Sequence, residues 1–178
     1  IYGWRSINRE TQFIGVIGFG SAEAKTIKLF NAALSAAEMN VRLLPIQTRN
    51  LSQTRKMLDV LKVNTLIVGR NFADQVLMLA DDREDICERA QFADLLLKQK
   101  TGKLKAFSCS WRSAVRTLEA VVGGATPENS RPLEKTKVLV IGSSGLAQSI
   151  IHGITKRKGL VSVATLDDDS ARRIAEQY

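Results

Sequence analysis

Short apolar runs rich in branched side chains alternate along the chain with segments whose apolar residues have helical spacing. The short runs indicate strands at residues 12–17, 41–46, 64–69 and 104–110. The segments between and after them predict helices at 22–39, 51–61, 73–79 and 111–122. Residues 86–100 fit a strand or a helix, because periodicity does not separate the two there. Pro45 indicates that the second strand lies at an edge or ends there. The alternation predicts an α/β fold.

Residues 123–132 (GGATPENSRP) have no periodicity and concentrate turn formers, which makes them the best boundary in the chain. After them, the pattern predicts a buried strand at 137–141, a glycine-containing turn at 142–145, a helix at 147–156 and a second strand at 160–166. Strand, turn, helix and strand form a βαβ unit, whose two strands should be parallel. The sequence therefore predicts two α/β parts that divide at this loop.

The turn of the βαβ unit lies where a dinucleotide-binding loop should lie, directly after a strand and opening a helix. There one glycine permits the tight turn, a second lets the backbone approach the pyrophosphate, and a third allows close packing of helix on strand. In this chain Ser144 and Ala147 replace the second and third glycines, so an ordinary βα turn is an equal alternative. The candidate cofactor-binding residues are Gly142, Ser143, Ser144, Gly145, Leu146 and Ala147.

Three acidic residues, Asp167, Asp168 and Asp169, follow the second strand of this unit. An acidic side chain at that point can hold the ribose hydroxyls of NAD and repels the 2′-phosphate of NADP, and Asp167 is the candidate for this role. The alternative is the start of a helix, with Asp168 or Asp169 as its cap.

Composition narrows the classes of partner. The chain of 178 residues carries 26 Lys and Arg against 18 Asp and Glu, a formal charge of +8, which raises the question of nucleic acid. The basic residues are scattered over predicted helix faces without a DNA-reading motif, so a solvated surface is favoured and nucleic acid is not expected. Attraction of an anionic metabolite or a phosphorylated cofactor is the minor alternative. No apolar run approaches the ~20 residues of a membrane span, and we expect a cytoplasmic protein.

The remaining reactive residues suggest no further chemistry. Cys87 and Cys109 are expected to be buried, reduced thiols, and no residues have metal-ligand spacing. His152, the single histidine, is expected to be packed or on the surface. The acidic run at 81–85 is interpreted as a solvated face near a helix end.

Residues 2–18 (YGWRSINRETQFIGVIG) resemble the junction where a type I 3-dehydroquinate dehydratase runs into a shikimate dehydrogenase, with "Y-x-x-R" followed by "T-x-x-x-G-x-I-G". The resemblance continues without a gap to Glu119, through Asn31-Ala32-Ala33 and Gly102-Lys103-Leu104, and resumes at Lys137. It implies a substrate-binding α/β domain followed by the first βαβ unit of a Rossmann-type dinucleotide-binding domain. The implied ranges are 1–12 for a linker from a preceding domain, 13–122 for the first domain, 123–132 for the interdomain loop and 133–178 for the partial second domain. We expect the chain to be a piece of a longer protein.

Members of the shikimate dehydrogenase family interconvert 3-dehydroshikimate and shikimate with NADP in the shikimate pathway of aromatic amino acid biosynthesis. Their catalytic Lys, at the end of "V-T-x-P-x-K", falls on Asn71 with Arg70 beside it, and their catalytic Asp, in "N-T-D", falls on Ser110. The "S-x-S" that binds the substrate carboxylate falls on 24–26, so Thr26 alone keeps a hydroxyl, and the Asn of "G-A-x-N" falls on Asp94.

The family's NADP-selecting "N-R-T" falls on Thr165-Leu166-Asp167, where Leu166 removes the Arg that grips the 2′-phosphate. The cofactor is therefore expected to be NADP or NAD, with NAD favoured by Leu166 and Asp167. The resemblance implies a shikimate dehydrogenase-like protein that acts on a small anionic metabolite. With its catalytic residues replaced, it is expected to be impaired or inactive as a dehydrogenase, that is, a pseudoenzyme. The expected partner is a fused 3-dehydroquinate dehydratase. Two alternatives stay open, an NAD-dependent oxidoreductase of altered specificity on a related hydroxy acid and a non-catalytic binding or regulatory domain.

Overall fold

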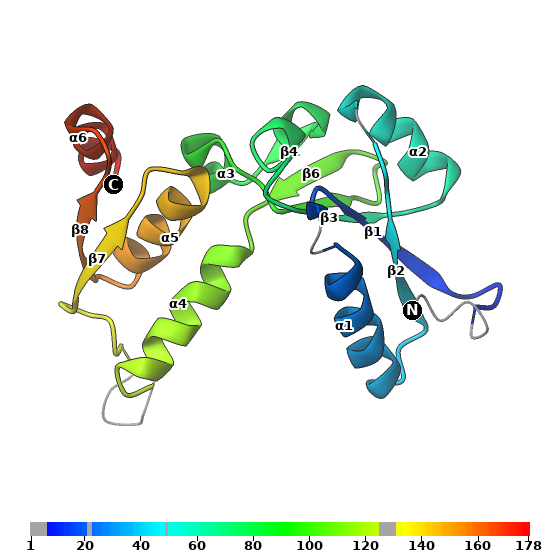
Figure 1. Ribbon diagram of the computed structural model, residues 1–178, viewed down its shortest axis with the longest axis horizontal. Coiled ribbons are helices and arrows are strands. Elements are labelled where there is room, and N and C mark those ends of the chain that lie inside the picture. The colour runs from blue at the N-terminus through cyan, green and yellow to red at the C-terminus, as the bar shows by residue number, and fades with distance from the viewer. Residues whose placement is uncertain (1–6, 21–22, 49, 125–130) are drawn as a thin grey trace. The chain divides into compact units, whose positions relative to one another are not determined.

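The computed structural model describes residues 7–20, 23–48, 50–124 and 131–178. The chain forms two compact units, the first made of Ile1–Glu84 and Ala93–Phe107 and the second of Asp85–Phe92 and Ser108–Tyr178. Both contain helices and strands (Figure 1), which confirms the predicted α/β class. The predicted loop at 123–132 falls in the second unit, and its residues 125–130 lie outside the described residues. The assignment of a substrate-binding and a dinucleotide-binding domain stays a prediction.

The first unit is built on a six-stranded sheet with the order β2-β1-β3-β5-β6-β4. β1 pairs in parallel with β2 and with β3, β5 is antiparallel to β3 and to β6, and the short β4 is parallel to β6. The strands are β1 (Gln12–Ile17), β2 (Val41–Pro45), β3 (Thr65–Val68), β4 (Asp82–Arg83), β5 (Leu95–Lys98) and β6 (Leu104–Phe107). The helical segments are α1 (Glu23–Ala36), α2 (Thr54–Val60) and the 3-10 helices η3 (Leu51–Gln53) and η4 (Gln75–Leu79).

Helix α1 lies on one side of this sheet and α2 on the other (Figure 1). Ile27 of α1 is fully buried against Val16 of β1 and Leu43 of β2. The buried side chain of Asn31 also fastens α1 to the edge strand β2, because it accepts a hydrogen bond from the Leu43 N–H (2.8 Å) and donates to the Leu43 carbonyl (3.5 Å). The edge position predicted from Pro45 is therefore confirmed, and Asn31 satisfies polar groups on the outer side of β2.

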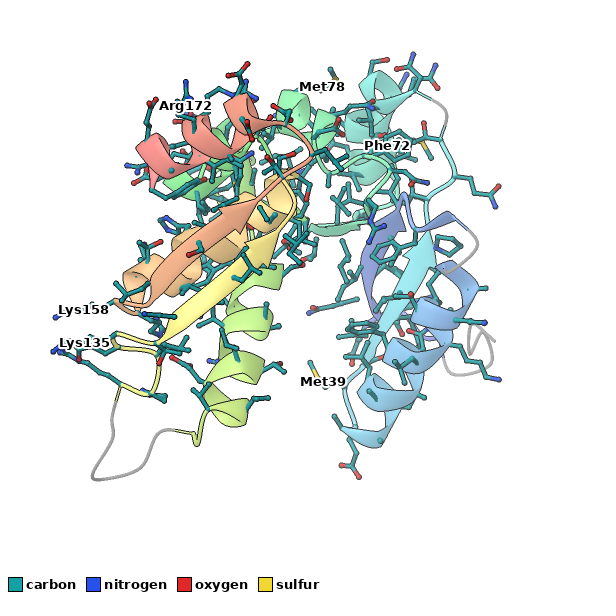
Figure 2. All side chains as sticks on the ribbon, turned by 60° about the vertical axis from the view of Figure 1, so that its left-hand side comes forward. Met39, Phe72, Met78, Lys135, Lys158 and Arg172 are labelled. Carbon is teal, nitrogen blue, oxygen red and sulfur yellow. The ribbon has the colours of Figure 1, made fainter. Side chains whose placement is uncertain are left out.

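The second unit has a two-stranded parallel sheet of β7 (Lys137–Ile141) and β8 (Leu160–Ala164), as the βαβ pattern predicted. Its helices are α3 (Asp85–Ala90), α4 (Ser110–Val121), α5 (Gly145–Lys156) and α6 (Asp168–Gln177). Trp111, Val115, Leu133 and Ile154 form its core. Lys135 and Lys158, which precede the two strands, lie side by side (Figure 2), and the Lys135 N–H donates to the Lys158 carbonyl (2.9 Å).

Some predicted elements differ from the structure. The helix expected at 22–39 ends at Ala36, because Glu38 adopts a left-handed conformation (φ 55°). The ambiguous segment at 86–100 contains both a helix, α3, and a strand, β5. The strand at 137–141 was expected to be buried, but Leu139 and Ile141 are 62% and 79% exposed, since only alternate residues of β7 face the core. None of the described helices is long and apolar enough to cross a membrane.

Candidate functional site

The turns that follow β1 and β3 are bonded to each other at one edge of the sheet in the first unit. The Gly69 N–H donates to the Ile17 carbonyl (2.6 Å), and the Asn71 N–H donates to the Gly18 carbonyl (3.2 Å). The Asn71 side-chain nitrogen lies 3.5 Å from the point that a Cβ on Gly20 would occupy. Asn71 is exposed beside the turn that leads from β1 into α1, where ligands commonly bind in parallel α/β sheets.

Close approach of the two turns depends on Gly69. A Cβ at this position would lie 2.5 Å from the Gly18 carbonyl oxygen, a distance that real Cβ atoms essentially never show. Gly18 itself has φ +79°, and Phe72, labelled in Figure 2, packs over it. Glycine is therefore required at positions 18 and 69, and the turn that carries the Asn71 side chain is held close to the turn after β1.

Asp94 and Thr26 lie at the same edge of the sheet. β5 runs antiparallel to β3, so the start of β5 is next to the end of β3. Asp94, immediately before β5, accepts the Val68 N–H at its carbonyl (2.9 Å) and donates its own N–H to Phe107 (3.1 Å). Thr26 is half-buried in the first turns of α1, which leaves the carboxyl end of β1. The structure thus brings three of the predicted residues, Thr26, Asn71 and Asp94, to one edge of the first unit.

Ser110, the fourth predicted residue, belongs to the second unit, where it is exposed as the first residue of α4. The backbone just before it is held by Arg112, whose guanidinium donates to the Ser108 carbonyl (2.6 Å).

The candidate dinucleotide turn, Gly142–Ala147, joins β7 to α5 in the second unit. The Gly142 N–H donates to the Ala164 carbonyl (2.8 Å), which ties the turn to the end of β8. Ser143 and Ser144 are exposed, and Ala147 is buried. Exposed backbone at the start of a helix of 12 residues suits an anionic phosphate, because the first N–H groups lack helical partners and the dipole is positive there.

Gly145 packs against residues that sequence reasoning did not single out. A Cβ on Gly145 would lie 2.5 Å from the Phe92 Cβ and 2.6 Å from the Ala90 carbonyl oxygen, at the end of α3. No local signal marks Ala90 and Phe92 as neighbours of the turn, because the contact joins segments more than 50 residues apart. The glycine is therefore required for close packing of the turn on α3.

Asp167 caps α6. Its Oδ1 accepts the Ser170 N–H (2.8 Å), and its backbone is extended (φ −136°, ψ 142°), as an N-cap residue requires. Hydrogen bonds from the backbone and the side chain of Ser170, together with the positive charge of nearby Arg173, lower the pKa of Asp167. The helix start that the sequence offered as an alternative is thus present. The expectation that Asp168 or Asp169 caps it was wrong, because the helix already begins at Asp168.

The acidic run at 81–85 was interpreted as a solvated face near a helix end, and Asp81 and Asp82 are exposed just before the start of α3. Asp81 pairs with Arg55 (2.8 Å) and Asp82 with Lys105 (2.7 Å), and Asp82 belongs to strand β4. Within the described residues, no group of three or more His, Cys, Asp and Glu could hold a metal ion. His152 is half-buried between the rings of Trp111 and Tyr178 (centroid distances 5.9 and 6.2 Å), the packed arrangement predicted for it. Neither cysteine forms a disulfide, and Cys87 is buried as predicted, whereas Cys109 is only partly buried.

Comparisons with known proteins agree with the motifs, although no protein-family model matches the chain. The shikimate dehydrogenase (NADP(+)) of Aquifex aeolicus is 24% identical over 174 residues, which cover 97% of this chain and 61% of that protein. The chain therefore spans less than two thirds of this relative's length.

Two solved structures show the same fold. A shikimate dehydrogenase from Aquifex aeolicus superposes with a TM-score of 0.78 at 21% identity, covering 97% of this chain and 62% of the other. The quinate dehydrogenase from Corynebacterium glutamicum, solved in complex with NAD, gives 0.74 at 18% identity, with 94% and 59% covered. The chain is thus similar over nearly its whole length to a curated shikimate dehydrogenase, and it has the fold of solved shikimate and quinate dehydrogenases.

Proposed function

We propose that the chain is a shikimate dehydrogenase-like protein that keeps a substrate edge and a dinucleotide turn, while its dehydrogenase step is impaired. The observation that carries the proposal is Asn71, a neutral amide on the turn after β3, where the resemblance places a catalytic Lys. A dehydratase fused before residue 1 is the partner that the junction-like segment at 2–18 favours.

The chemistry explains why this replacement matters. A bound nicotinamide cofactor supplies or accepts the hydride, and the protein must move the accompanying proton at the substrate hydroxyl or ketone. An amide at Asn71 and a hydroxyl at Ser110 do not titrate near neutral pH, so they cannot act as the general acid or base. Loss of such a group commonly costs about 10²–10⁴-fold in rate. Arg70 does not replace it, because a guanidinium stays protonated in proteins.

Binding of a small anionic hydroxy acid is retained in this proposal. Lys25 and Arg70 are exposed cations of the first unit, on the elements that follow β1 and β3, and Thr26 supplies a hydroxyl. Asp94 opposes an anion and alters which hydroxy acid fits. For the cofactor, the acidic Asp167 and the absence of Arg at Leu166 support NAD over NADP.

Rescue of the missing groups tests the proposal. Shikimate oxidation is measured with NAD⁺ and with NADP⁺ for the wild type, Asn71→Lys, Ser110→Asp and the double variant. We expect the double variant to exceed the wild type by about 10²-fold or more, because it supplies a titratable Lys and a titratable Asp at the two positions to which the resemblance assigns the catalytic residues. Arg70→Lys is the matched control, since it places a Lys one residue away and should restore nothing. Robust wild-type turnover that Asn71→Ala abolishes would contradict the proposal.

A further inference from the structure

Three small residues of the dinucleotide turn have three different structural roles. Gly142 has φ +123°, a conformation that L side chains rarely adopt, so it makes the turn. Gly145 has no room for a Cβ, because residues 90–92 pack against it. Ser144 lies between them with ordinary extended dihedral angles (φ −62°, ψ 159°), so the backbone itself does not require glycine there.

The side chain of Ser144 turns back onto its own helix. Ser144 is the N-cap of α5, and its hydroxyl oxygen accepts a hydrogen bond from the Ala147 N–H (3.3 Å). That N–H belongs to the first turn of α5, the group of donors that a phosphate uses when it binds a helix N-terminus. The hydroxyl therefore occupies a donor that a dinucleotide pyrophosphate needs. It also adds a side chain where the fingerprint has a glycine for close approach.

We infer that Ser144 is a specificity-determining residue that weakens dinucleotide binding by capping α5 in place of the cofactor's phosphate. The inference rests on the proposed cofactor site at Gly142–Ala147. To bind, the pyrophosphate must displace the Ser144 hydroxyl from the Ala147 N–H. The hydrogen bond that the phosphate gains there replaces one that the free protein already has. Removal of the hydroxyl leaves this N–H open to the phosphate. Without this hydroxyl, α5 has no N-cap in the free protein and gains one only when the cofactor's phosphate binds.

Opposite changes in binding and stability distinguish this role from a purely structural one. Binding of NAD⁺ and of NADP⁺ is measured by titration calorimetry for the full chain and for Ser144→Ala and Ser144→Gly. We expect the Kd to fall by about threefold to tenfold in both variants, the range that corresponds to one net hydrogen bond. The urea midpoint of the free protein falls, more for Ala than for Gly, because glycine is a tolerable N-cap residue.

Thr136→Ala is the matched control. Thr136 also lies in the second unit and donates its hydroxyl to the Pro132 carbonyl (3.0 Å), at the amino end of β7, the opposite end from the turn. This variant should lower the urea midpoint and leave the Kd unchanged.

Weaker binding by Ser144→Ala would identify the hydroxyl as a phosphate ligand and overturn the inference. If the Kd is unchanged and the urea midpoint is lower, Ser144 acts only as a helix cap, and the inference is likewise overturned. Absence of NAD⁺ and NADP⁺ binding in the wild type and in both variants contradicts the proposed cofactor site itself, and the inference falls with it.

Discussion

Asp81 uses both carboxylate oxygens in hydrogen bonds to residues that are distant in sequence. The Arg55 guanidinium donates to Oδ1 (3.0 Å) and Oδ2 (2.8 Å), and the Leu104 N–H also donates to Oδ2 (2.8 Å). The Arg55 side chain, followed by the Leu104 N–H, lowers the pKa of Asp81 below its ordinary value of 3.8. All three bonds favour the ionised form.

We predict from this pKa that Asp81 contributes to acid sensitivity. A group with a lowered folded-state pKa stabilises the protein above its unfolded-state value, near 3.8, and loses this contribution as the pH falls through the lower folded-state value. Asp81→Asn should therefore be less stable than the wild type at neutral pH and lose less stability as the pH falls below about 4. Urea titrations across this range measure the effect. Equal losses in the two proteins would show that Asp81 is not responsible.

Residue-level chemistry was only partly readable from the sequence. The acidic run was visible, but the Arg55 and Lys105 partners were not, because they lie 26 and 23 positions from the carboxylates they meet. Asp167 was singled out for the ribose of a cofactor, and the structure adds a capping role that any Asp at a helix start can have.

At the level of elements, the start of α5 is anchored by buried hydroxyls as well as by α3. Ser149 is fully buried, and its hydroxyl donates to the Gly145 carbonyl (2.9 Å). Ser108, also fully buried just before α4, donates to the Ser149 hydroxyl (3.2 Å). This chain of hydrogen bonds links the segment that leads to Ser110 with the candidate dinucleotide turn within the second unit.

A double-mutant cycle tests this link. Ser149→Ala removes the hydroxyl that joins Ser108 to Gly145, and a lost buried hydrogen bond should lower the free energy of unfolding by about 1–3 kcal/mol. Because the two serines share one bond, the Ser108→Ala/Ser149→Ala variant should lose less than the sum of the single losses, by about 0.5–1.5 kcal/mol. Urea denaturation of the four proteins gives these values. Strictly additive losses would mean that the hydroxyls act independently.

Element prediction succeeded where a continuous apolar run or a clear helical period existed, as in β1, β7 and α5. It failed where geometry depends on neighbours. β4 has only two residues and exists only through its pairing with β6, so no local pattern marks it as a strand. Residues 73–79 have helical spacing but form only the short η4, since Ala73 bonds through its carbonyl to the Ala93 N–H (2.8 Å) instead of continuing a helix.

At the level of the whole molecule, each unit has its own sheet and its own buried cluster. Val16, Ile27 and Leu43 are buried together in the first unit, and Trp111, Val115, Leu133 and Ile154 in the second. The chain passes between the units after Glu84, Phe92 and Phe107. The sequence could not predict these three crossings, because α3 and α4 carry no local signal of which sheet they accompany.

Because each unit has its own core, we predict that each unit unfolds locally without the other. Ile154 is 1% exposed, so Ile154→Ala should cost about 2–5 kcal/mol within the second unit. In native-state hydrogen exchange, the amides of β7 and α5 should then exchange faster while those of β1 and β3 keep the wild-type rates. Ile27→Ala, at a position that is 0% exposed in the first unit, is the matched control and should give the reverse pattern. Equal acceleration in both units by either variant would mean that the two cores unfold as one cooperative structure.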